Sequence, residues 1–263
     1  MRRRRPAEVS LERALSKLGI LSRARAREAI LAGRVVVDGR PATDPGRPVV
    51  PERADLRLDG RPVGRAPWRT VLLHKPRGVV TTLDDPEGRA SVRDLLPDEL
   101  GHLGPVGRLD RATSGLLLLT NDTALAEWLC NPANGVERTY LVTVRGEVGE
   151  SEAATACAGL EIDGERLRAR SVTVRKRSGR ESHLVVVLDE GKNREIRRLF
   201  AALGHEVVRL KRVGFGSLTL GRLAPGAFRD LGLAEVQTAF PGARVGGSAP
   251  EPLRVATRTR VCR

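Results

Sequence analysis

A short loop that leads into a run of leucines constrains the fold of this chain more than any other stretch. Residues 106–115 read Val-Gly-Arg-Leu-Asp-Arg-Ala-Thr-Ser-Gly, and Leu116–Leu119 follow directly. The leucine run is too short for a membrane span and is typical of a buried central strand. The loop holds Asp110 between Arg108 and Arg111, and its two glycines permit backbone geometries that other residues avoid. The pattern predicts a carboxylate presented in a cationic loop at the edge of a rigid sheet, although a turn aspartate in a surface ion pair fits it equally well.

The charge balance indicates a polyanionic partner. The chain has 46 Lys and Arg against 32 Asp and Glu, a formal net charge of +14 over 263 residues. Phosphate neutralisation dominates the affinity of proteins for nucleic acids, so nucleic acid is the first candidate. A membrane surface is the lesser candidate, because the sequence has no long basic amphipathic helix with aromatic anchors. The length allows one large domain or two smaller ones, and the 40% share of hydrophobic residues suffices for a core.

The cysteines and the chain ends suggest a compartment. Cys130, Cys157 and Cys262 are odd in number and far apart, so they give neither metal-ligand spacing nor a disulfide framework. We therefore expect no metal and a reducing, cytoplasmic environment. A basic run at the start is followed by no apolar segment, which argues against a signal peptide. Residues 1–7 and 241–263 are expected to be disordered basic tails.

Residues 8–64 predict a small domain of two helices and a hairpin. Two stretches with helical spacing, each preceded by a serine N-cap, cover residues 11–18 and 23–32. A strand at 35–37 then meets an Asp-Gly turn, which is a strong hairpin signal. A linker rich in Gly, Pro and Arg follows at 60–67, so we expect a domain boundary near its end.

This stretch resembles a small RNA-binding domain named after a ribosomal small-subunit protein, the alpha-L type. The resemblance rests on Leu11, Ala14, Leu18, Gly19, Ser22, Arg23, Ala26, Ile30, Gly33, Val35, Val37, Asp38 and Gly39. In that family the second helix and the following hairpin meet RNA phosphates, which implies RNA contacts for Arg23, Arg27 and Arg34. The family's usual Ser-Arg-Arg is altered here, because Ala24 replaces the second arginine and Arg25 stands beside it. The alternative is that these are exposed arginines without a partner.

A second informative helix is expected after residues 190–193. Its apolar face follows helical spacing and consists of Ile196, Leu199, Phe200 and Leu203. Arg194 and Arg198 lie four residues apart on the opposite side and suit contact with phosphates. Arg197 lies at the border of the apolar face, where a partly buried guanidinium suits pairing with a carboxylate. Alternating patterns predict strands over 137–146, 166–176 and 183–188.

Together, these stretches resemble the pseudouridine synthases of the RsuA and RluB type. The matching motifs are residues 75–78, 107–122, 138–140 (with arginine where the family has lysine), 190–198 and 223–231. The resemblance runs from about residue 8 to 236 and includes the small N-terminal domain in the right order. It implies an α+β fold in which a mixed, mostly antiparallel sheet forms a catalytic domain over residues 68–240.

The resemblance also implies chemistry. The enzyme would be an isomerase that converts a uridine of ribosomal RNA to pseudouridine without a cofactor, because bond energy is exchanged and not supplied. Asp110 would be the catalytic carboxylate, either as a nucleophile or as the base of a glycal route. Arg197 would keep Asp110 ionised, and Tyr140 would stack against the target base. Arg108 would contact the phosphate beside a flipped nucleotide.

Other positions follow from the same resemblance. Lys75 and Lys192, with Arg194 and Arg198, are the remaining candidates for RNA contact, and Leu141 and Ile196 are expected to line the site. The Asn-Arg-Glu-Ile-Arg-Arg form favours the large-subunit branch. We expect a monomer that acts on ribosomal RNA or on a subunit assembly intermediate. The alternative is a non-catalytic RNA-binding protein of ribosome assembly; a glycoside hydrolase would need a second placed carboxylate, which the sequence does not indicate.

Overall fold

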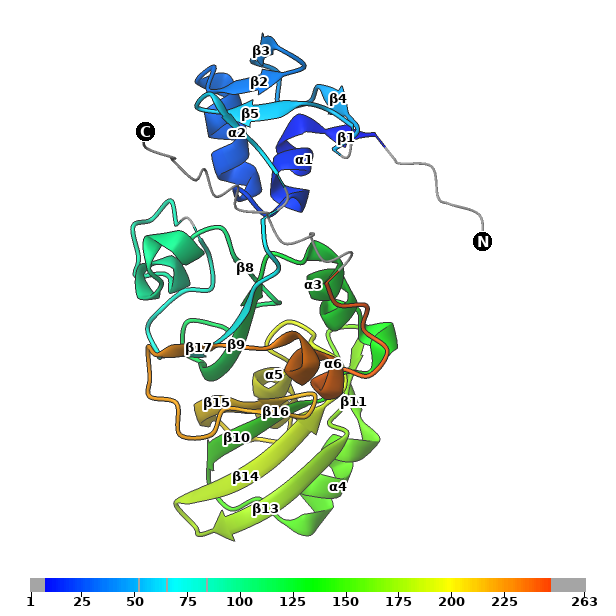
Figure 1. The fold of residues 1–263 in the computed structure, drawn as a ribbon. Helices are drawn as coiled ribbons and strands as arrows, with labels where there is room; N and C mark the ends of the chain where they lie inside the picture. Colours follow the sequence, from blue (N-terminus) through cyan, green and yellow to red (C-terminus); the bar gives the residue numbers. More distant parts are fainter. Residues whose placement is uncertain (1–7, 52, 65, 84, 247–263) are drawn as a thin grey trace, which may run out of the picture. The chain divides into compact units, whose positions relative to one another are not determined.

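The computed structural model describes residues 8–246 except 52, 65 and 84. The described chain forms two compact units, one that ends at Trp68 and one that spans Arg69–Val245 (Figure 1). Each unit has its own hydrophobic core, and each is described separately below.

The predicted tails lie largely outside this range. Of residues 1–7 and 241–263, only 241–246 are described. No helix among the described residues is long and apolar enough to cross a membrane. Cys130 and Cys157 are free thiols.

Two helices pack against small sheets in the first unit. The helices are α1 (Leu11–Lys17) and α2 (Arg23–Leu31), and the Ser22 hydroxyl caps α2 by accepting a hydrogen bond from the Arg25 amide at 3.3 Å. The strands are β1 (Val9–Ser10), β2 (Val35–Val37), β3 (Arg40–Ala42), β4 (Pro48–Val49), β5 (Leu56–Leu58) and β6 (Arg61–Pro62). Strand order is β3-β2-β5-β6, with β1 paired to β4. Asp38 and Gly39 have φ values of 52° and 78°, so the Asp-Gly hairpin turn is confirmed.

The second unit is built on one large sheet. Its strands are β7 (Thr70–Lys75), β8 (Gly104–Pro105), β9 (Ser114–Thr120), β10 (Arg138–Arg145), β13 (Ser171–Arg177), β14 (Glu181–Leu188), β15 (Val207–Phe215), β16 (Leu218–Thr219) and β17 (Phe228–Asp230). A separate hairpin joins β11 (Leu160–Ile162) to β12 (Glu165–Leu167). The α-helices are α3 (Thr123–Cys130), α4 (Glu150–Ala158), α5 (Glu195–Ala202) and α6 (Leu233–Ala239).

The strand order of the large sheet is β13-β14-β10-β15-β9-β7-β17, with β16 on β15 and β8 on β9. Every neighbouring pair is antiparallel except β15 with β9. The predicted α+β class with a mixed, mostly antiparallel sheet is therefore confirmed. The single strand predicted over 166–176 is wrong, because β12 and β13 belong to different sheets and the chain between them is not a strand.

Strand β9 is the buried centre of this sheet. The side chains of Leu116–Leu119 are fully buried, which confirms the predicted central strand. Burial of each such side chain stabilises the fold by roughly 2 kcal/mol relative to exposure. The parallel ladder to β15 is short and is recorded only at Ser114–Lys211 and Gly115–Arg212. The pairing of β9 with β15 is thus confined to the start of β9, directly after the loop that carries Asp110.

The helices cover one face of the β13-β14-β10 half of the sheet. Helix α4 packs against β13, and α5 packs against β15 and β11. Inward side chains such as Val142 and Val186 share a core with Leu199 and Phe200 of α5. In Figure 1 the opposite face of β13 and β14 has no helix in front of it.

Candidate active site

The loop around Asp110 is fixed by backbone contacts on both sides of that residue. The Thr81 hydroxyl donates to the Leu109 carbonyl at 2.7 Å and accepts from the Leu109 amide at 3.2 Å. On the other side, the Gly78 amide donates to the Arg111 carbonyl at 2.8 Å, and the Arg111 guanidinium returns a bond to the Gly78 carbonyl at 3.2 Å. The backbone on either side of Asp110 is therefore held in place, which suits a residue that must meet a substrate in one geometry.

Asp110 lines a pocket of about 240 Å³. The walls come from the 106–113 loop, the end of α3, strands β10 and β15, and the segment that leads into α5. The charged lining residues are Arg108, Asp110, Arg138, Lys192, Arg194, Glu195 and Arg212. Five cations against two carboxyl groups make this an electropositive pocket, which suits a substrate that carries phosphate.

The structure brings several predicted site residues together here. Arg108, Asp110, Tyr140, Lys192 and Arg194 all line the pocket. Tyr140 reaches it from β10 with its side chain 8% exposed. These residues come from three separate segments of the sequence, so the fold creates the cluster.

Arg197 lies near Asp110 but does not contact it directly. Burial lowers the pKa of Arg197, the Arg194 charge lowers it further, and the negative charge of Asp110 opposes both. One guanidinium nitrogen donates to the Val207 carbonyl at 2.8 Å, while Nε and Nη2 are buried without a partner. The structure records no hydrogen bond or ion pair between these two described side chains, so the predicted pairing stays a prediction.

The prediction that Lys75 contacts RNA is wrong for this structure. Its side chain is fully buried, and Nζ donates to the carbonyls of Pro76 at 3.0 Å and Val79 at 2.7 Å. Burial lowers the pKa of Lys75 to about 8, and the Asp110 charge opposes this shift. The residue cannot meet a phosphate at the surface in this conformation. It supports the turn that fixes the Asp110 loop.

The lowered pKa of Lys75 predicts that the free energy of unfolding rises with pH. Between about pH 8 and 10.5, the unfolded chain binds a proton at this lysine that the folded chain does not, so the free energy of unfolding increases with pH. Relative to Lys75→Met, the protein should gain about 2 kcal/mol between pH 7.5 and 9.5. Urea unfolding of both proteins across this range measures the difference. Parallel pH profiles would contradict the burial of a charged ammonium.

Arg138 clamps the start of β10 to the loop before α5. Its Nη1 donates to the carbonyls of Val136 at 2.9 Å and Glu190 at 3.2 Å, and Nη2 donates to Leu129 at 3.0 Å. Its side chain is buried, which lowers the pKa of Arg138. The arginine that stands where the resembling family has lysine therefore joins three segments of the pocket wall.

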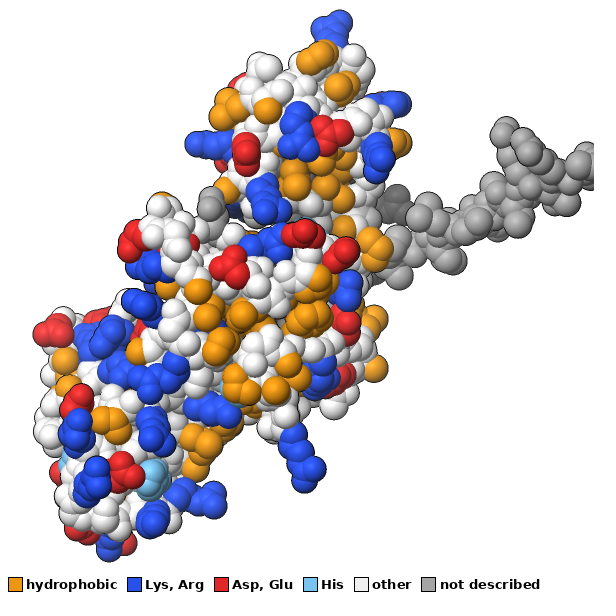
Figure 2. All heavy atoms as spheres, turned by 90° about the vertical axis from the view of Figure 1, so that its left-hand side faces the viewer, with side chains coloured by type: hydrophobic (Ala, Val, Ile, Leu, Met, Phe, Trp, Pro, Cys, Tyr) orange, Lys and Arg blue, Asp and Glu red, His pale blue; other side chains and the backbone are white. Residues whose placement is uncertain are grey.

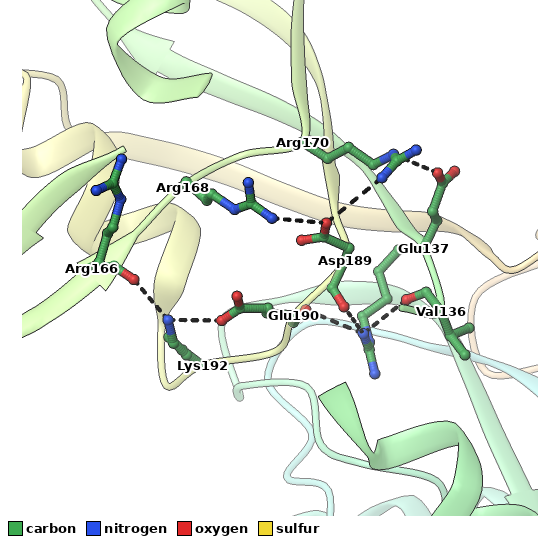
Figure 3. A network of polar contacts seen from close by, with 9 residues as sticks. Val136, Glu137, Arg166, Arg168, Arg170, Asp189, Glu190 and Lys192 are labelled. Carbon is green, nitrogen blue, oxygen red and sulfur yellow. Dashed lines mark hydrogen bonds and ion pairs between the residues drawn. The ribbon is translucent and has the colours of Figure 1, made fainter. Parts of the chain in front are cut away.

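Several ion pairs hold the loop before α5 (Figure 3). Arg168 and Arg170 approach the Asp189 carboxylate at 3.4 and 3.8 Å, and Arg170 also pairs with Glu137 at 2.7 Å. Lys192 Nζ pairs with Glu190 at 2.7 Å. Lys192 thus lines the pocket as predicted for an RNA contact, but its charge is already partnered.

Arg212 and Phe215 were not predicted from the sequence. Arg212 is 3% exposed, and its Nε donates to the Leu116 carbonyl at 2.7 Å, which joins β15 to β9 at the short parallel ladder. The guanidinium carbons of Arg138 and Arg212 lie 5.2 and 5.0 Å from the Phe215 ring centre. Aromatic contacts of this kind stabilise buried cations, yet nothing in the sequence separates these arginines from the many exposed ones.

Glu195 supplies a second carboxyl group that the sequence did not indicate. It is 3% exposed, and Oε2 accepts a hydrogen bond from the Lys192 amide at 3.1 Å. Burial raises the pKa of Glu195. The hydrogen bond caps the turn before α5, so Glu195 shapes the loop that carries Lys192 and Arg194.

The structure corrects the predicted roles of Leu141 and Arg198. Leu141 does not line the pocket; it follows Tyr140 on a strand, so it projects to the opposite face, where it is 46% exposed. Ile196, by contrast, is a lining residue. Arg198 donates to the Ile162 carbonyl at 3.0 Å and pairs with Asp163 at 3.3 Å, so it fastens the β11–β12 turn and is not a free cation.

The predicted RNA contacts of the first unit are all exposed. Arg23 has no ion pair among the described residues, whereas Arg27 pairs with Glu12 at 2.9 Å. Arg34 forms two bonds with Asp59, at 2.8 and 2.6 Å. Exposed pairs of this kind contribute little to stability.

Comparison with known protein families gives two matches in chain order. Residues 10–53 match the S4 domain. Residues 69–202 match the family described as RNA pseudouridylate synthase. The second match includes the Asp110 loop, Tyr140 and Arg197.

Individual proteins resemble the chain over most of its length. An uncharacterised RNA pseudouridine synthase of Aquifex aeolicus is 35% identical, over 89% of this chain and 94% of its own. Ribosomal large subunit pseudouridine synthase B of Vibrio cholerae is 38% identical, over 86% of this chain and 72% of its own. The crystal structure of a pseudouridylate synthase superposes with a TM-score of 0.61 at 26% identity, covering 88% of this chain and 99% of that one.

Proposed function

The chain belongs to the RNA pseudouridylate synthase family, and on that premise we propose that it isomerises a uridine of large-subunit ribosomal RNA, with Asp110 as the catalytic carboxylate. The observation that carries the proposal is the placement of Asp110 in an electropositive pocket together with Tyr140. The large subunit is favoured because relatives from Vibrio cholerae and Bacillus subtilis carry that subunit in their names.

The reaction asks little of the protein beyond placement and charge. The bond from N1 of uracil to C1′ of the ribose breaks, a bond from C5 to C1′ forms, the C5 proton leaves, and N1 gains a proton. No electron is gained or lost overall, so neither a redox group nor a group donor is required. Asp110 acts either as the nucleophile or as the base that removes a ribose proton.

The neighbours of Asp110 receive distinct tasks in this proposal. Tyr140 stacks on the flipped uracil, because its ring lies in the pocket wall on a rigid central strand. Arg108 and Arg194 bind the phosphates that flank the flipped nucleotide. The positive charge of Arg197 stabilises the Asp110 carboxylate, and its two unpartnered guanidinium nitrogens can donate to that carboxylate when RNA binds.

The first unit binds RNA outside the pocket through Arg23, Arg27 and Arg34. The domain boundary proposed at residues 60–67 makes residues 8–64 an accessory binding domain and 68–240 the catalytic one. We propose that the protein acts as a cytoplasmic monomer on ribosomal RNA or on an assembly intermediate of the subunit.

A pseudouridine map of ribosomal RNA tests the function. Cells that lack this protein should lack pseudouridine at one or a few large-subunit positions, and the wild-type chain should restore it. Fully modified RNA in the deletion strain would contradict the proposal. If that strain also accumulated immature subunits, the non-catalytic assembly function would replace it.

A further inference from the structure

Among the described residues, no helix lies in front of the face of β13 and β14 that points away from the pocket (Figure 1). Side chains alternate between the two faces of a strand, and Tyr140 lines the pocket, so Leu141 projects from the other side. The same alternation holds along β14, where buried residues alternate with half-buried ones such as Val185 and His183. We call the surface formed by these outward positions of β13, β14, β10 and β15 the outer face.

The register of the strands orders the outer face into three rows that cross all four strands, and beyond the first row Glu181 of β14 pairs with Arg145 of β10. The first row is Lys176, His183, Thr143 and Arg209. The second row is Thr173, Val185, Leu141 and Lys211. The third row is Ser171, Val187, Thr139 and Gly214. None of these twelve positions holds a carboxylate. They hold Lys and Arg, Ser and Thr, one histidine, Val and Leu, and one glycine.

The cations of these rows are unpartnered. In the part of the chain that the structure describes, no ion pair is recorded for Lys176, Arg209 or Lys211. Glu181, which lies next to the first row, contacts the His183 imidazole at 3.1 Å. The outer face therefore carries a positive charge that the protein itself does not neutralise.

Neighbouring arginines on the same strands are neutralised. Arg145 of β10 pairs with Glu206 at 2.6 Å, and Arg177 of β13 pairs with Glu147 at 3.5 Å. Figure 2 shows Lys and Arg side chains, with Asp and Glu between them, at the lower end of the second unit, where Figure 1 places β13 and β14. Acidic partners are thus available at the margins of the sheet and missing from the rows within it.

The dimensions and chemistry of the face fit an RNA backbone. Strands lie about 4.8 Å apart, so Lys176 and Arg209, three strand spacings from each other, are roughly 14 Å apart, and Arg209 and Lys211 are roughly 7 Å apart. The hydroxyls between them suit ribose and phosphate oxygens. The rows hold no Phe, Tyr or Trp, so the face suits contact with the RNA backbone more than stacking on bases.

We propose that the outer face is a second RNA-binding surface, which holds the phosphate backbone of an RNA segment other than the one that carries the reacting uridine. The proposal rests on the proposed function in so far as the substrate is a large structured RNA. Because the face and the pocket lie on opposite sides of one sheet, a short stem–loop in the pocket cannot reach it. A larger RNA that wraps around the sheet edge can contact both.

The test compares two triple variants of the full chain. The first is Lys176→Gln, Arg209→Gln and Lys211→Gln, which removes the unpartnered cations. The matched control is Arg69→Gln, Arg177→Gln and Arg229→Gln, which removes the same charge from exposed arginines that are paired with carboxylates. Binding of a domain-sized ribosomal RNA fragment and of a short stem–loop with the target uridine is measured over a series of salt concentrations.

The first variant should lower the salt slope for the large fragment by about 2 to 3, at roughly 0.9 per lost phosphate contact. Its affinity for that fragment should fall at least tenfold at low salt, while binding and turnover of the stem–loop stay unchanged. The control should keep the salt slope of the wild type. Thermal unfolding of both variants checks that the sheet is intact.

Equal slopes for the two variants would overturn the proposal. So would an equal loss on the stem–loop, which would put these cations on the RNA path of the pocket, or a change of molecular mass in light scattering, which would make the face a contact between copies. The measurement is one of binding, so an inactive wild-type protein would defeat the proposed function without deciding the outer face.

Discussion

Replacement of Asp110 by asparagine should reduce turnover by at least about 1,000-fold, because asparagine can neither attack carbon nor accept a proton. The side chain is nearly isosteric, and the structure records no hydrogen bond to the Asp110 carboxylate among the described residues that the substitution would remove. Folding should therefore be unaffected, and RNA affinity should change little. Single-turnover assays on a stem–loop, with tritium release from C5 of the uracil, measure the chemical step directly.

Asp163→Asn is the matched control. Asp163 is an exposed turn carboxylate of the β11–β12 hairpin with a left-handed backbone, φ 53°, and it pairs with Arg198 at 3.3 Å. Its replacement removes the same charge from the same unit and should leave turnover within about twofold. Asp110→Asn turnover close to that of the control would show that another group performs the chemistry, and Glu195 would become the next candidate.

The sequence predicted the Asp110 loop well because its signals are local. Flanking arginines, glycines at the turns and an apolar strand directly after them all lie within seventeen residues. The glycines Gly107 and Gly115 indeed have positive φ, at 69° and 112°. The resemblance of several spaced motifs then tied this loop to Tyr140 and to the helix of Arg197.

Lys75 and Leu141 show where such reasoning fails. A Lys-Pro turn between two strands looks exposed in a sequence, but here β7 is buried along its whole length and the ammonium meets two carbonyls of its own turn. Leu141 stands beside a pocket residue in sequence, but adjacent strand residues face opposite sides of a sheet. On a strand, therefore, the residue next to a site residue in sequence lies on the other side of the sheet.

The buried arginines mark a second limit. Arg138 and Arg212 build the pocket wall, but in a chain with 46 Lys and Arg no local pattern separates them from surface cations. Their partners are carbonyls up to 96 residues away. The parallel pairing of β9 with β15 is equally long-range, and the alternation of single strands carries no information about which strands become neighbours.

Replacement of Gly115 by alanine should cost about 4 kcal/mol or more of the free energy of unfolding. Gly115 is the point of closest approach between β9 and β15: a Cβ there would lie 2.1 Å from the Arg212 carbonyl oxygen, and the φ of 112° already disfavours any side chain. The atoms in the way belong to the backbone of Arg212, which cannot rotate away as a flexible side chain can. Strands β9 and β15 must therefore separate. The separation would break the short parallel ladder and the hydrogen bond from Arg212 to the Leu116 carbonyl, and it would displace Arg212, which lines the pocket.

Gly164→Ala separates the steric effect from the backbone effect. Gly164 also has a positive φ, 75°, but nothing lies within 4 Å of the position of its Cβ. Alanine there should cost only about 1 kcal/mol, the penalty of a left-handed backbone alone. Urea unfolding of the two variants gives both costs, and near-equal values would mean that β9 and β15 can move apart freely. A large excess for Gly115→Ala, together with lost turnover, would show that the approach of these two strands holds Asp110 and Arg212 in one pocket.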